Sequence, residues 1–461
     1  MSVQETISPI DGSVFARRNF AAPERIDAVL NRAVAAQRDW AARSLEERTV
    51  LCGRFCDALL GHSDEIALEL AWSMGRPVAQ GPGEVRGCVE RARFMISAAE
   101  EGLAALDPGN KPGFRRYVRR VPLGVVFVIA PWNYPFLTAV NTVIPAIMAG
   151  NVVVLKHAAQ TQLVAERFQQ AFDAAGLPEG VFQHLQIAGA TAQALVGDAR
   201  IAHVAFTGSV AVGHAVSRAA ADRFISVGLE LGGKDPAYVR ADADVAFAAE
   251  NLVDGAFFNS GQSCCGIERI YVHASVYDDF IDRAVAATLL YRLGDPTEAA
   301  TNLGPVVSAK AAAFIRAQTE EAITQGARGL IRPADFAADA PGSAYLAPQI
   351  LVDVTHGMRA MTEETFGPVV GVMKVGSDDE AVRLMNDSEY GLTAAIFSAD
   401  VGAAEAIGAR IETGTVFLNR CDYLDPALPW TGVKDTGRGH TLSRWGFEQL
   451  TRPQAFHLRL P

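Results

Sequence analysis

The amino-acid sequence predicts an α/β protein with a doubly wound parallel sheet, followed by a second α/β series. Short runs without polar side chains, at 124–130 and 152–155, have the composition of parallel strands that are buried on both faces. Segments with apolar residues at helical spacing separate such runs. A chain of 461 residues is also too long for one hydrophobic core, so two or three domains are expected.

The composition argues against several classes of protein. Hydrophobic residues make up 49% of the chain and charged residues 20%, as in ordinary globular proteins and unlike disordered ones. A net charge of -11, without a long basic run, argues against nucleic acid as the main partner. The six cysteines lack a regular disulfide spacing, and the N-terminus lacks the apolar core of a secretory signal. Reduced thiols and a cytoplasmic location are therefore expected.

One stretch has the length of a membrane helix, because residues 121–155 contain no charged side chain. Four prolines and three asparagines interrupt it, and a helix in lipid would have to satisfy the backbone groups that they free. A buried strand, loop, helix and second strand fit this stretch better, so no membrane association is expected.

The first hundred residues are predicted to be helical, with helices over 26–40, 45–60 and 64–73. Residues 112–120 (PGFRRYVRR) differ, since apolar residues alternate loosely among four arginines. We expect an exposed ribbon here that meets another element or another subunit.

An alternation of strands and helices starts at Gly124. One helix covers 137–148, and the helix after Lys156 carries Val164, Phe168 and Phe172 on one face before it ends at Gly176. This βαβαβ series predicts the doubly wound sheet. Its strands are expected at 124–130, 152–155, 182–186, 203–207 and 226–229.

A second α/β series follows Glu230. Its strands are expected at 270–272, 369–373, 394–397 and 415–418, and its helices at 245–257, 276–293, 311–325 and 379–386. The last ten residues (RPQAFHLRLP) alternate like an exposed edge strand, which commonly finds a partner. Together with the arginine ribbon, this edge predicts a homo-oligomer.

Two residues could carry covalent chemistry. Cys264 lies among small and polar residues in NSGQSCC, where a thiol can be reached and ionised, although a loop cysteine without function is the commoner case. Glu230 lies between two leucines at the carboxyl end of a predicted strand, where open α/β sheets bind ligands. An apolar frame favours the protonated carboxyl, so Glu230 could act as a general base; the alternative is a surface glutamate.

Three further features could bind a cofactor or an oxyanion. The segment 206–213 follows a strand and opens a helix, whose free N–H groups suit a pyrophosphate, but a plain helix cap is the alternative. No complete G-x-G-x-x-G fingerprint occurs in the chain. Asn133 could donate its amide to an oxyanion or be a turn residue. Lys156 could reach a ribose or phosphate, or be a solvated lysine.

Together these segments resemble the aldehyde dehydrogenase superfamily, in order and over nearly the whole chain. The matching motifs are PWN at 131–133, Lys156, FTGS at 206–209, LELGG at 229–233, GQSC at 261–264, EETFGP at 363–368, NDSEYGL at 386–392 and GVKDTGRG at 432–439. The resemblance implies the aldehyde dehydrogenase fold, with three parts. These are a Rossmann-like NAD(P)-binding domain (1–110 and 123–230), an α/β catalytic domain (231–435) and a small β oligomerisation element (111–122 and 448–461) in a homodimer or homotetramer.

The resemblance also implies a mechanism without a metal. Cys264 would add to the aldehyde, and the Asn133 amide with the Cys264 N–H would stabilise the thiohemiacetal oxyanion. Hydride transfer would leave a thioester, which water activated by Glu230 would hydrolyse. NAD or NADP would be held by Ile129, Pro131, Trp132, Lys156, Gly189, Phe206, Thr207, Gly208, Ser209, Leu231, Gly232, Glu364 and Phe366.

Three positions depart from the family pattern. Ala159 stands where many NAD-preferring relatives carry a glutamate that binds the adenosine ribose, so NADP is permitted. Thr142 and Thr441 stand where relatives often carry a lysine and a glutamate with proton-relay roles. Proton transfer is therefore expected to differ here.

The substrate funnel implied by the family has aromatic walls, which suit an apolar or aromatic aldehyde. The LKHA segment and the chain length are closest to the succinate-semialdehyde branch, for which Arg420 could bind the distal carboxylate. A coenzyme-A-acylating enzyme would not need Glu230, and a non-catalytic relative would typically lack the thiol. The funnel residues are Tyr134, Asn141, Phe257, Ser263, Cys265, Arg420, Asp422, Tyr423, Leu424 and Trp430.

Overall fold

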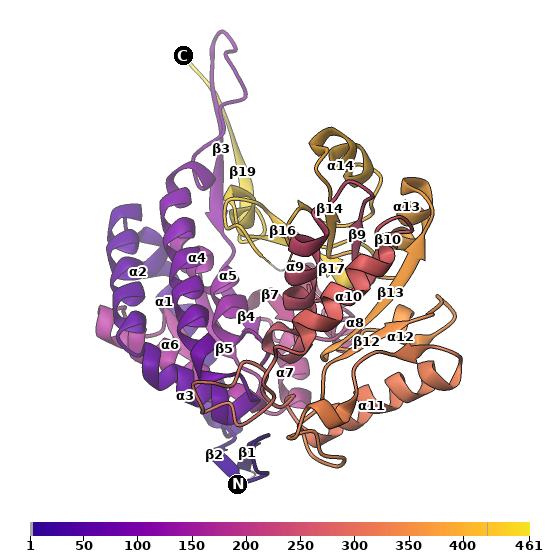
Figure 1. Ribbon diagram of the computed structural model, residues 1–461. Helices are drawn as coiled ribbons and strands as arrows, with labels where there is room; N and C mark the ends of the chain where they lie inside the picture. The colour runs from indigo at the N-terminus through magenta and orange to yellow at the C-terminus, as the bar shows by residue number, and fades with distance from the viewer. Residues whose placement is uncertain (1–2, 422) are drawn as a thin grey trace.

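The computed structural model describes residues 3–421 and 423–461, which form two α/β halves side by side (Figure 1). The predicted N-terminal helices are present as α1 (Pro23–Ala42), α2 (Leu45–Leu60) and α3 (Ser63–Met74), followed by α4 (Gly81–Gly102). Helix α2 begins at Ser44, whose side chain and that of Glu47 form a complete capping box.

The prediction that the first hundred residues are all helical is wrong at their start. Strands β1 (Val3–Ile7) and β2 (Val14–Asn19) form a two-stranded antiparallel ribbon. Each strand is short and pairs only with the other, so neither carries the long apolar alternation that marks a strand in a sequence. The local signal was the Asp11–Gly12 turn, where Gly12 has a φ of 77°.

The first large sheet has the predicted doubly wound parallel order, with one addition. Its order is β17-β8-β7-β4-β5-β6, and all pairs are parallel except β17 with β8. The strands are β4 (Val125–Ile129), β5 (Val152–Lys156), β6 (Phe182–His184), β7 (Ile201–Thr207), β8 (Ser226–Glu230) and β17 (Gly437–Arg438). The covering helices include α5 (Pro135–Met148), α6 (Leu163–Ala175), α7 (Gly189–Val196) and α8 (Val210–Ala219).

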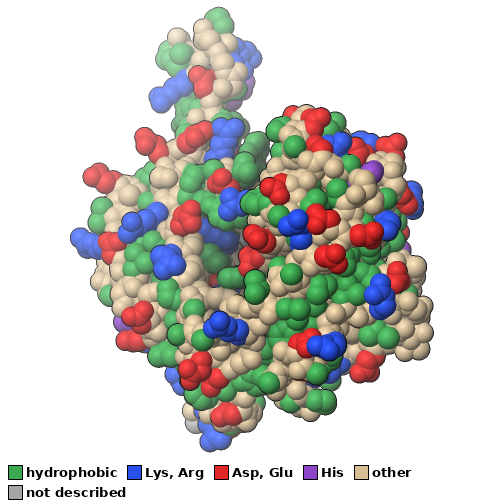
Figure 2. All heavy atoms as spheres, viewed as in Figure 1, with side chains coloured by type: hydrophobic (Ala, Val, Ile, Leu, Met, Phe, Trp, Pro, Cys, Tyr) green, Lys and Arg blue, Asp and Glu red, His purple; other side chains and the backbone are tan. Residues whose placement is uncertain are grey.

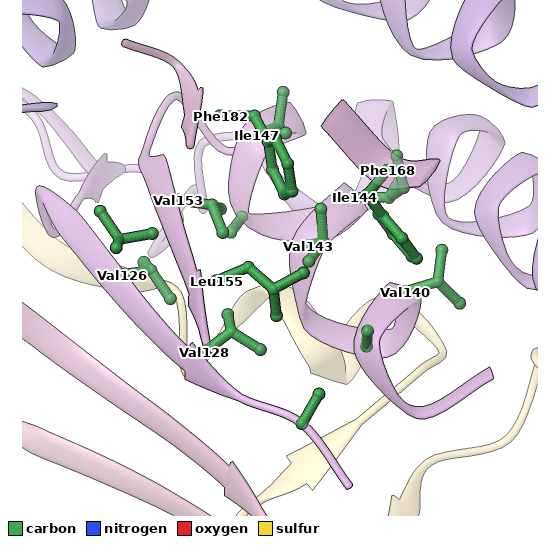
Figure 3. Packing of buried hydrophobic residues seen from close by; sticks show 14 of the residues in the cluster. Val126, Val128, Val140, Val143, Ile144, Ile147, Val153, Leu155, Phe168 and Phe182 are labelled. Carbon is green, nitrogen blue, oxygen red and sulfur yellow. The ribbon is translucent and has the colours of Figure 1, made fainter. Parts of the chain in front are cut away.

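The core of this half lies between the sheet and helices α5 and α6. Figure 3 shows apolar side chains of β4 and β5 packed against one face of α5: Val126, Val128, Val153 and Leu155 against Val140, Val143, Ile144 and Ile147. Each such side chain contributes about 1.5–3 kcal/mol when fully buried. This layer therefore fixes the positions of the strand ends that carry the candidate site.

The second large sheet has the order β11-β12-β13-β10-β9-β14-β15. Its strands are β9 (Asp235–Val239), β10 (Ile267–His273), β11 (Arg328–Gly329), β12 (Gln349–Val352), β13 (Val369–Val375), β14 (Thr393–Phe397) and β15 (Thr415–Leu418). The helices α9 (Val245–Phe257), α10 (Tyr277–Thr288), α11 (Ala309–Thr324) and α13 (Asp378–Asn386) were expected; α12 (Arg359–Thr362) and α14 (Val401–Gly408) were not.

Strand β9 was missed although it is central and fully buried. It contains Pro236, which normally marks an edge strand because proline cannot donate to the ladder. The pairing of β9 with β10 shifts its register between Ile267 and Arg269, opposite this proline.

The arginine ribbon forms an arm with the C-terminal strand. Strand β3 (Phe114–Pro122) pairs antiparallel with β19 (Thr451–Arg459), which confirms that the ribbon meets another element. Tyr117 stacks on Phe456 at 4.6 Å between ring centroids. The arm leads away from the body of the molecule, as Figures 1 and 2 show.

Across the described residues, no helix combines the length and apolar character needed to cross a membrane. All six cysteines are free thiols.

Candidate active site

The carboxyl ends of four neighbouring strands lie along one edge of the first sheet. The register aligns Lys156 with Ile129, and Ile129 with Phe206. The next strand brings Glu230 opposite Thr207. Open α/β sheets bind their ligands at this edge, so residues far apart in sequence meet where a ligand is expected.

A left-handed turn presents the thiol of Cys264 to this edge. Asn259, Ser260 and Gly261 follow helix α9 with φ values of 52°, 57° and 70°. A Cβ atom at Gly261 would come within 2.2 Å of the Gly367 carbonyl oxygen, so the turn needs glycine there. Cys264 is half-buried, whereas its neighbours on both sides are buried.

A buried hydrogen-bond network joins this turn to the loop of Asn133. Asn133 Nδ2 donates to the Gln262 carbonyl at 3.2 Å, and Asn259 Nδ2 donates to the Asn133 carbonyl at 3.2 Å. Arg76 binds both loops, through Asn259 Oδ1 at 3.1 Å and the Asn133 carbonyl at 2.6 Å. Asn133 is only 5% exposed, so these bonds are shielded from water and hold the two loops in a fixed relation.

Two cavities meet at Cys264. One has a volume of about 400 Å³ and reaches from Cys264 to helix α4, and the other, of about 180 Å³, reaches from Cys264 to the start of helix α8. In Figure 2 a hollow opens between the half that contains α4 and the half that contains α9, and basic side chains gather inside it. Cys264 therefore lines both cavities.

Most of the predicted cofactor residues line the smaller cavity: Pro131, Trp132, Thr207, Gly208, Ser209, Leu231, Gly232, Glu364 and Phe366. Four others do not line it. Ile129, Lys156 and Phe206 lie at the adjoining strand ends, and Gly189 is the first residue of α7.

The charged groups of this region fit a nucleotide. Burial lowers the pKa of Lys156, and no carboxylate of residues 3–421 or 423–461 opposes this effect, so its ammonium group can bind an oxygen-rich ligand. Burial and the nearby Glu268 carboxylate raise the pKa of Glu364 to about 7. A Cβ atom on Gly232 would lie 2.6 Å from the Glu364 carboxylate. Glu364 can therefore take this position in the cavity wall only because residue 232 is glycine.

The larger cavity is lined by most of the predicted funnel residues: Tyr134, Asn141, Ser263, Cys265, Tyr423, Leu424 and Trp430. Phe257 does not line it, because its ring is fully buried against Tyr291; the next residue, Phe258, lines it instead. Arg420 is exposed outside the cavity and stacks on Tyr423 at 3.4 Å. Asp422 lies outside the described residues.

One wall of the larger cavity was not predicted. Helix α4 contributes Gly83, Glu84, Arg86, Gly87, Glu90 and Arg91, and the preceding segment contributes Arg76 and Gln80. The available signal was the placement of Glu84 and Arg91 on the same helical face as Val85, Cys88 and Ala92, since charged residues seldom share a buried face without a reason.

Glu230 is held between two threonine hydroxyls. Thr441 donates to Oε1 at 2.6 Å and Thr207 donates to Oε2 at 3.3 Å. Burial raises the pKa of Glu230, and these two hydrogen bonds act against that rise. Thr441 thus stabilises the ionised carboxylate of Glu230. Thr441 itself occupies the position where relatives often have a second glutamate.

Comparison with known proteins agrees with this arrangement. A family model described as the aldehyde dehydrogenase family matches residues 2–456. A succinate-semialdehyde dehydrogenase [NADP(+)] 1 of Mycobacterium tuberculosis is 34% identical over 447 residues, which cover 96% of this chain and 97% of the relative. A succinate-semialdehyde dehydrogenase [NADP(+)] of Deinococcus radiodurans is 34% identical over 451 residues, covering 97% and 93%.

Solved structures confirm the expected fold. An NAD-dependent aldehyde dehydrogenase from Sinorhizobium meliloti superposes with a TM-score of 0.95 at 32% identity, covering 100% of this chain and 92% of that one. A succinic semialdehyde dehydrogenase from Streptococcus pyogenes, in complex with NADP+, gives a TM-score of 0.94 at 29% identity, covering 99% and 100%. The chain therefore belongs to the aldehyde dehydrogenase family and is an oxidoreductase that acts on an aldehyde with NAD or NADP.

Proposed function

We propose that the enzyme oxidises an aldehyde to the carboxylic acid through a thioester on Cys264. The observation that carries this proposal is the position of Cys264, where the two cavities meet. The thiolate adds to the carbonyl carbon, and the carbonyl oxygen becomes an oxyanion. Loss of hydride from that carbon gives the thioester, and attack by water then releases the acid and the thiol. The test is reduction of NAD+ or NADP+ over a panel of aldehydes; no reduction with any aldehyde would contradict the proposal.

The smaller cavity is proposed to hold the cofactor, whose nicotinamide accepts the hydride when it is bound. Gly208, Ser209 and the free N–H groups at the start of α8 suit the pyrophosphate. Lys156 and Glu364 are placed to bind ribose hydroxyls, and Phe366 packs edge-on against Trp132 at 5.6 Å. Ala159 presents no carboxylate to a 2′-phosphate, so NADP+ should be accepted, and parallel assays with both cofactors decide the preference.

Asn133 is proposed to stabilise the oxyanion together with the Cys264 N–H. Its amide has two N–H donors, and the bond to Gln262 uses one of them. Replacing Asn133 with alanine should lower kcat about 10²-fold to 10³-fold, because one preorganised donor is lost. Steady-state kinetics check this. The substitution also removes the buried bond to Gln262 and should lower the melting temperature, so an unchanged far-UV circular dichroism spectrum at the assay temperature is the control for folding. A rise in KM with kcat preserved would assign Asn133 to ground-state binding instead.

Glu230 is proposed as the base that activates the hydrolytic water. Only its ionised form can accept a proton, so turnover falls as the pH drops through its pKa, which burial raises above the ordinary value. Hydrolysis is what separates this reaction from acyl transfer to coenzyme A. Measuring acid and thioester products with and without coenzyme A distinguishes the two.

The Thr441 hydroxyl provides a direct test of that base. Replacing Thr441 with valine removes a donor to the carboxylate, so the pKa of Glu230 should rise further and the acidic limb of the deacylation–pH profile should move to higher pH. Thr441→Ser keeps the hydroxyl and serves as the matched control. An acidic limb that stays in place in Thr441→Val would show that another group controls deacylation.

The substrate is proposed from two observations. The relatives from Mycobacterium tuberculosis and Deinococcus radiodurans are succinate-semialdehyde dehydrogenases, so a short semialdehyde is our first candidate. The aromatic walls of the cavity favour an apolar aldehyde as the second. We propose a cofactor domain (1–110 and 123–230), a catalytic domain (231–435) and an oligomerisation element (111–122 and 448–461). The two sheets and the arm support this division, although β17 joins the first sheet from outside the range of the cofactor domain.

The arm of β3 and β19 is only two strands wide apart from a bridge between Val118 and Leu106, so its edges suit a homodimer or homotetramer, which light scattering tests. The free thiols suit the cytoplasm.

A further inference from the structure

Arg91 is a buried cation in the wall of the larger cavity. It lies on α4 and is 8% exposed. Its Nη1 atom donates to the Leu137 carbonyl at 3.0 Å and to Asn141 Oδ1 at 3.3 Å. Both acceptors belong to α5, and both are bound by Nη1, so α5 holds the guanidinium group through one of its three nitrogen atoms. An always-charged group in such a place is costly unless something compensates it.

No carboxylate among the described residues forms an ion pair with Arg91. Glu84, the carboxylate whose charge acts most strongly on Arg91, is already engaged: it pairs with Arg76 and accepts the backbone N–H groups of Phe136 and Leu137. Burial lowers the pKa of Arg91, and the carboxylates of Glu84 and Glu230 oppose this effect without forming an ion pair with it. The cavity wall therefore holds the neutralised Arg76–Glu84 pair, the exposed Arg86 and Glu90, and the buried Arg91, which has no ion-pair partner among the described residues.

The unused part of Arg91 is the Nε–Nη2 edge. Neither atom donates a hydrogen bond to any described residue. Neither belongs to the fully buried polar atoms that lack a hydrogen-bond partner. Arg240 uses the same edge to bind both oxygens of Asp378, at 3.2 and 3.1 Å. This edge matches a carboxylate, because its two N–H bonds run parallel.

The buried Arg269 is an example of an arginine with a structural role, because its hydrogen-bond donors are used within the protein. Its Nε, Nη1 and Nη2 atoms all donate, to backbone carbonyls that include those of Lys234, Leu384 and Met385. It lines neither of the two cavities that meet at Cys264. Arg91 differs in both respects, since it lines the substrate side and keeps its carboxylate-binding edge open.

We propose that Arg91 binds a carboxylate at the end of the substrate remote from the aldehyde. This inference rests on the proposed function of the site and names the substrate class: short aldehydes that carry a terminal carboxylate. Arg91 and Cys264 line the same cavity, of about 400 Å³, so one substrate can contact both, and a short aldehyde is our first choice. Arg420, the sequence-based candidate for this role, is exposed outside the cavity.

Matched pairs of aldehydes test the proposal. The wild-type enzyme should prefer 4-oxobutanoate to butanal, and Arg91→Met should lower kcat/KM for 4-oxobutanoate about 10²-fold to 10³-fold while kcat/KM for butanal stays within about threefold. Arg91→Lys should recover part of the loss, since lysine restores the positive charge but lacks the two parallel N–H donors of the guanidinium group. Arg93→Met is the control, because Arg93 is two residues away on α4 and binds the exposed Asp57.

Two results would overturn the proposal. An equal fall for both aldehydes would make Arg91 a structural residue, and no fall for 4-oxobutanoate would exclude the contact. The pH profile with butanal separates a third role. The charge of Arg91 lowers the pKa of Glu230, so the acidic limb should move to higher pH in Arg91→Met. The two aldehydes are therefore compared above that limb, where a loss confined to 4-oxobutanoate reports the carboxylate contact.

A binding measurement keeps this test independent of catalysis. Succinate should slow the alkylation of Cys264 by iodoacetamide, measured by mass spectrometry, whereas succinamide should not, and Arg91→Met should abolish the protection. Protection of a protein that oxidises no aldehyde would refute the proposed function but not the carboxylate site. Oxidation of butanal and 4-oxobutanoate with equal efficiency, without protection, would refute the site alone.

Discussion

Replacing Cys264 with serine should lower aldehyde oxidation more than about 10⁴-fold while cofactor binding remains unchanged. The hydroxyl is close to the thiol in size but ionises far less readily, so the adduct with the carbonyl is lost. The smaller cavity keeps its other walls, because the remaining lining residues are untouched. Absorbance of the reduced cofactor measures the first effect, and quenching of tryptophan fluorescence by NAD(P)+ measures the second.

Cys421 provides the control for this substitution. It is half-buried, lies outside both cavities and should tolerate serine without loss of turnover. Turnover by Cys264→Ser at more than a few per cent of the wild-type rate would rule out the thioester mechanism.

Replacing Glu230 with glutamine should separate acylation from deacylation. Glutamine has the same shape and can still bond to Thr441 and Thr207, but it cannot accept a proton from water. Deacylation should slow about 10²-fold to 10⁴-fold. Each active site should then release one equivalent of reduced cofactor in a burst, and the acyl group should remain on Cys264, where rapid quenching and mass spectrometry detect it.

The outcome of the burst experiment is decisive for the base. Steady turnover at the wild-type rate would show that Glu230 does not activate the water. A variant that forms no acyl-enzyme at all would move Glu230 to the earlier step, as the base that activates the thiol.

The sequence predicted well those features that depend on local pattern. The apolar runs of β4 and β5 marked buried strands, and the residues that end β5 and β8, Lys156 and Glu230, therefore fell at the ligand-binding edge. Helices α2 and α9 begin and end at the predicted residues, because caps and helical spacing are local signals.

The sequence could not show contacts that arise only on folding. Arg91 lies on an ordinary amphipathic helix, and its uncompensated charge becomes visible only when α5 and the Cys264 loop close the cavity around it. Phe257 ends helix α9 and Phe258 follows it with an extended ψ of 141°, so the residue at which the helix stops decides which ring enters the cavity. The bond between Thr441 and Glu230 spans 211 positions, beyond the reach of any local pattern.

Residues 437–461 reach back to the first half of the molecule: β17 closes the edge of β8, and β19 pairs with β3. A ribosome must therefore synthesise residues 437–438 before β8, the strand that ends in Glu230, gains its second neighbour. Until then that flank of the nascent sheet offers unsatisfied backbone groups to other chains. An N-terminal fragment, however well its own core folds, would carry an incomplete catalytic apparatus.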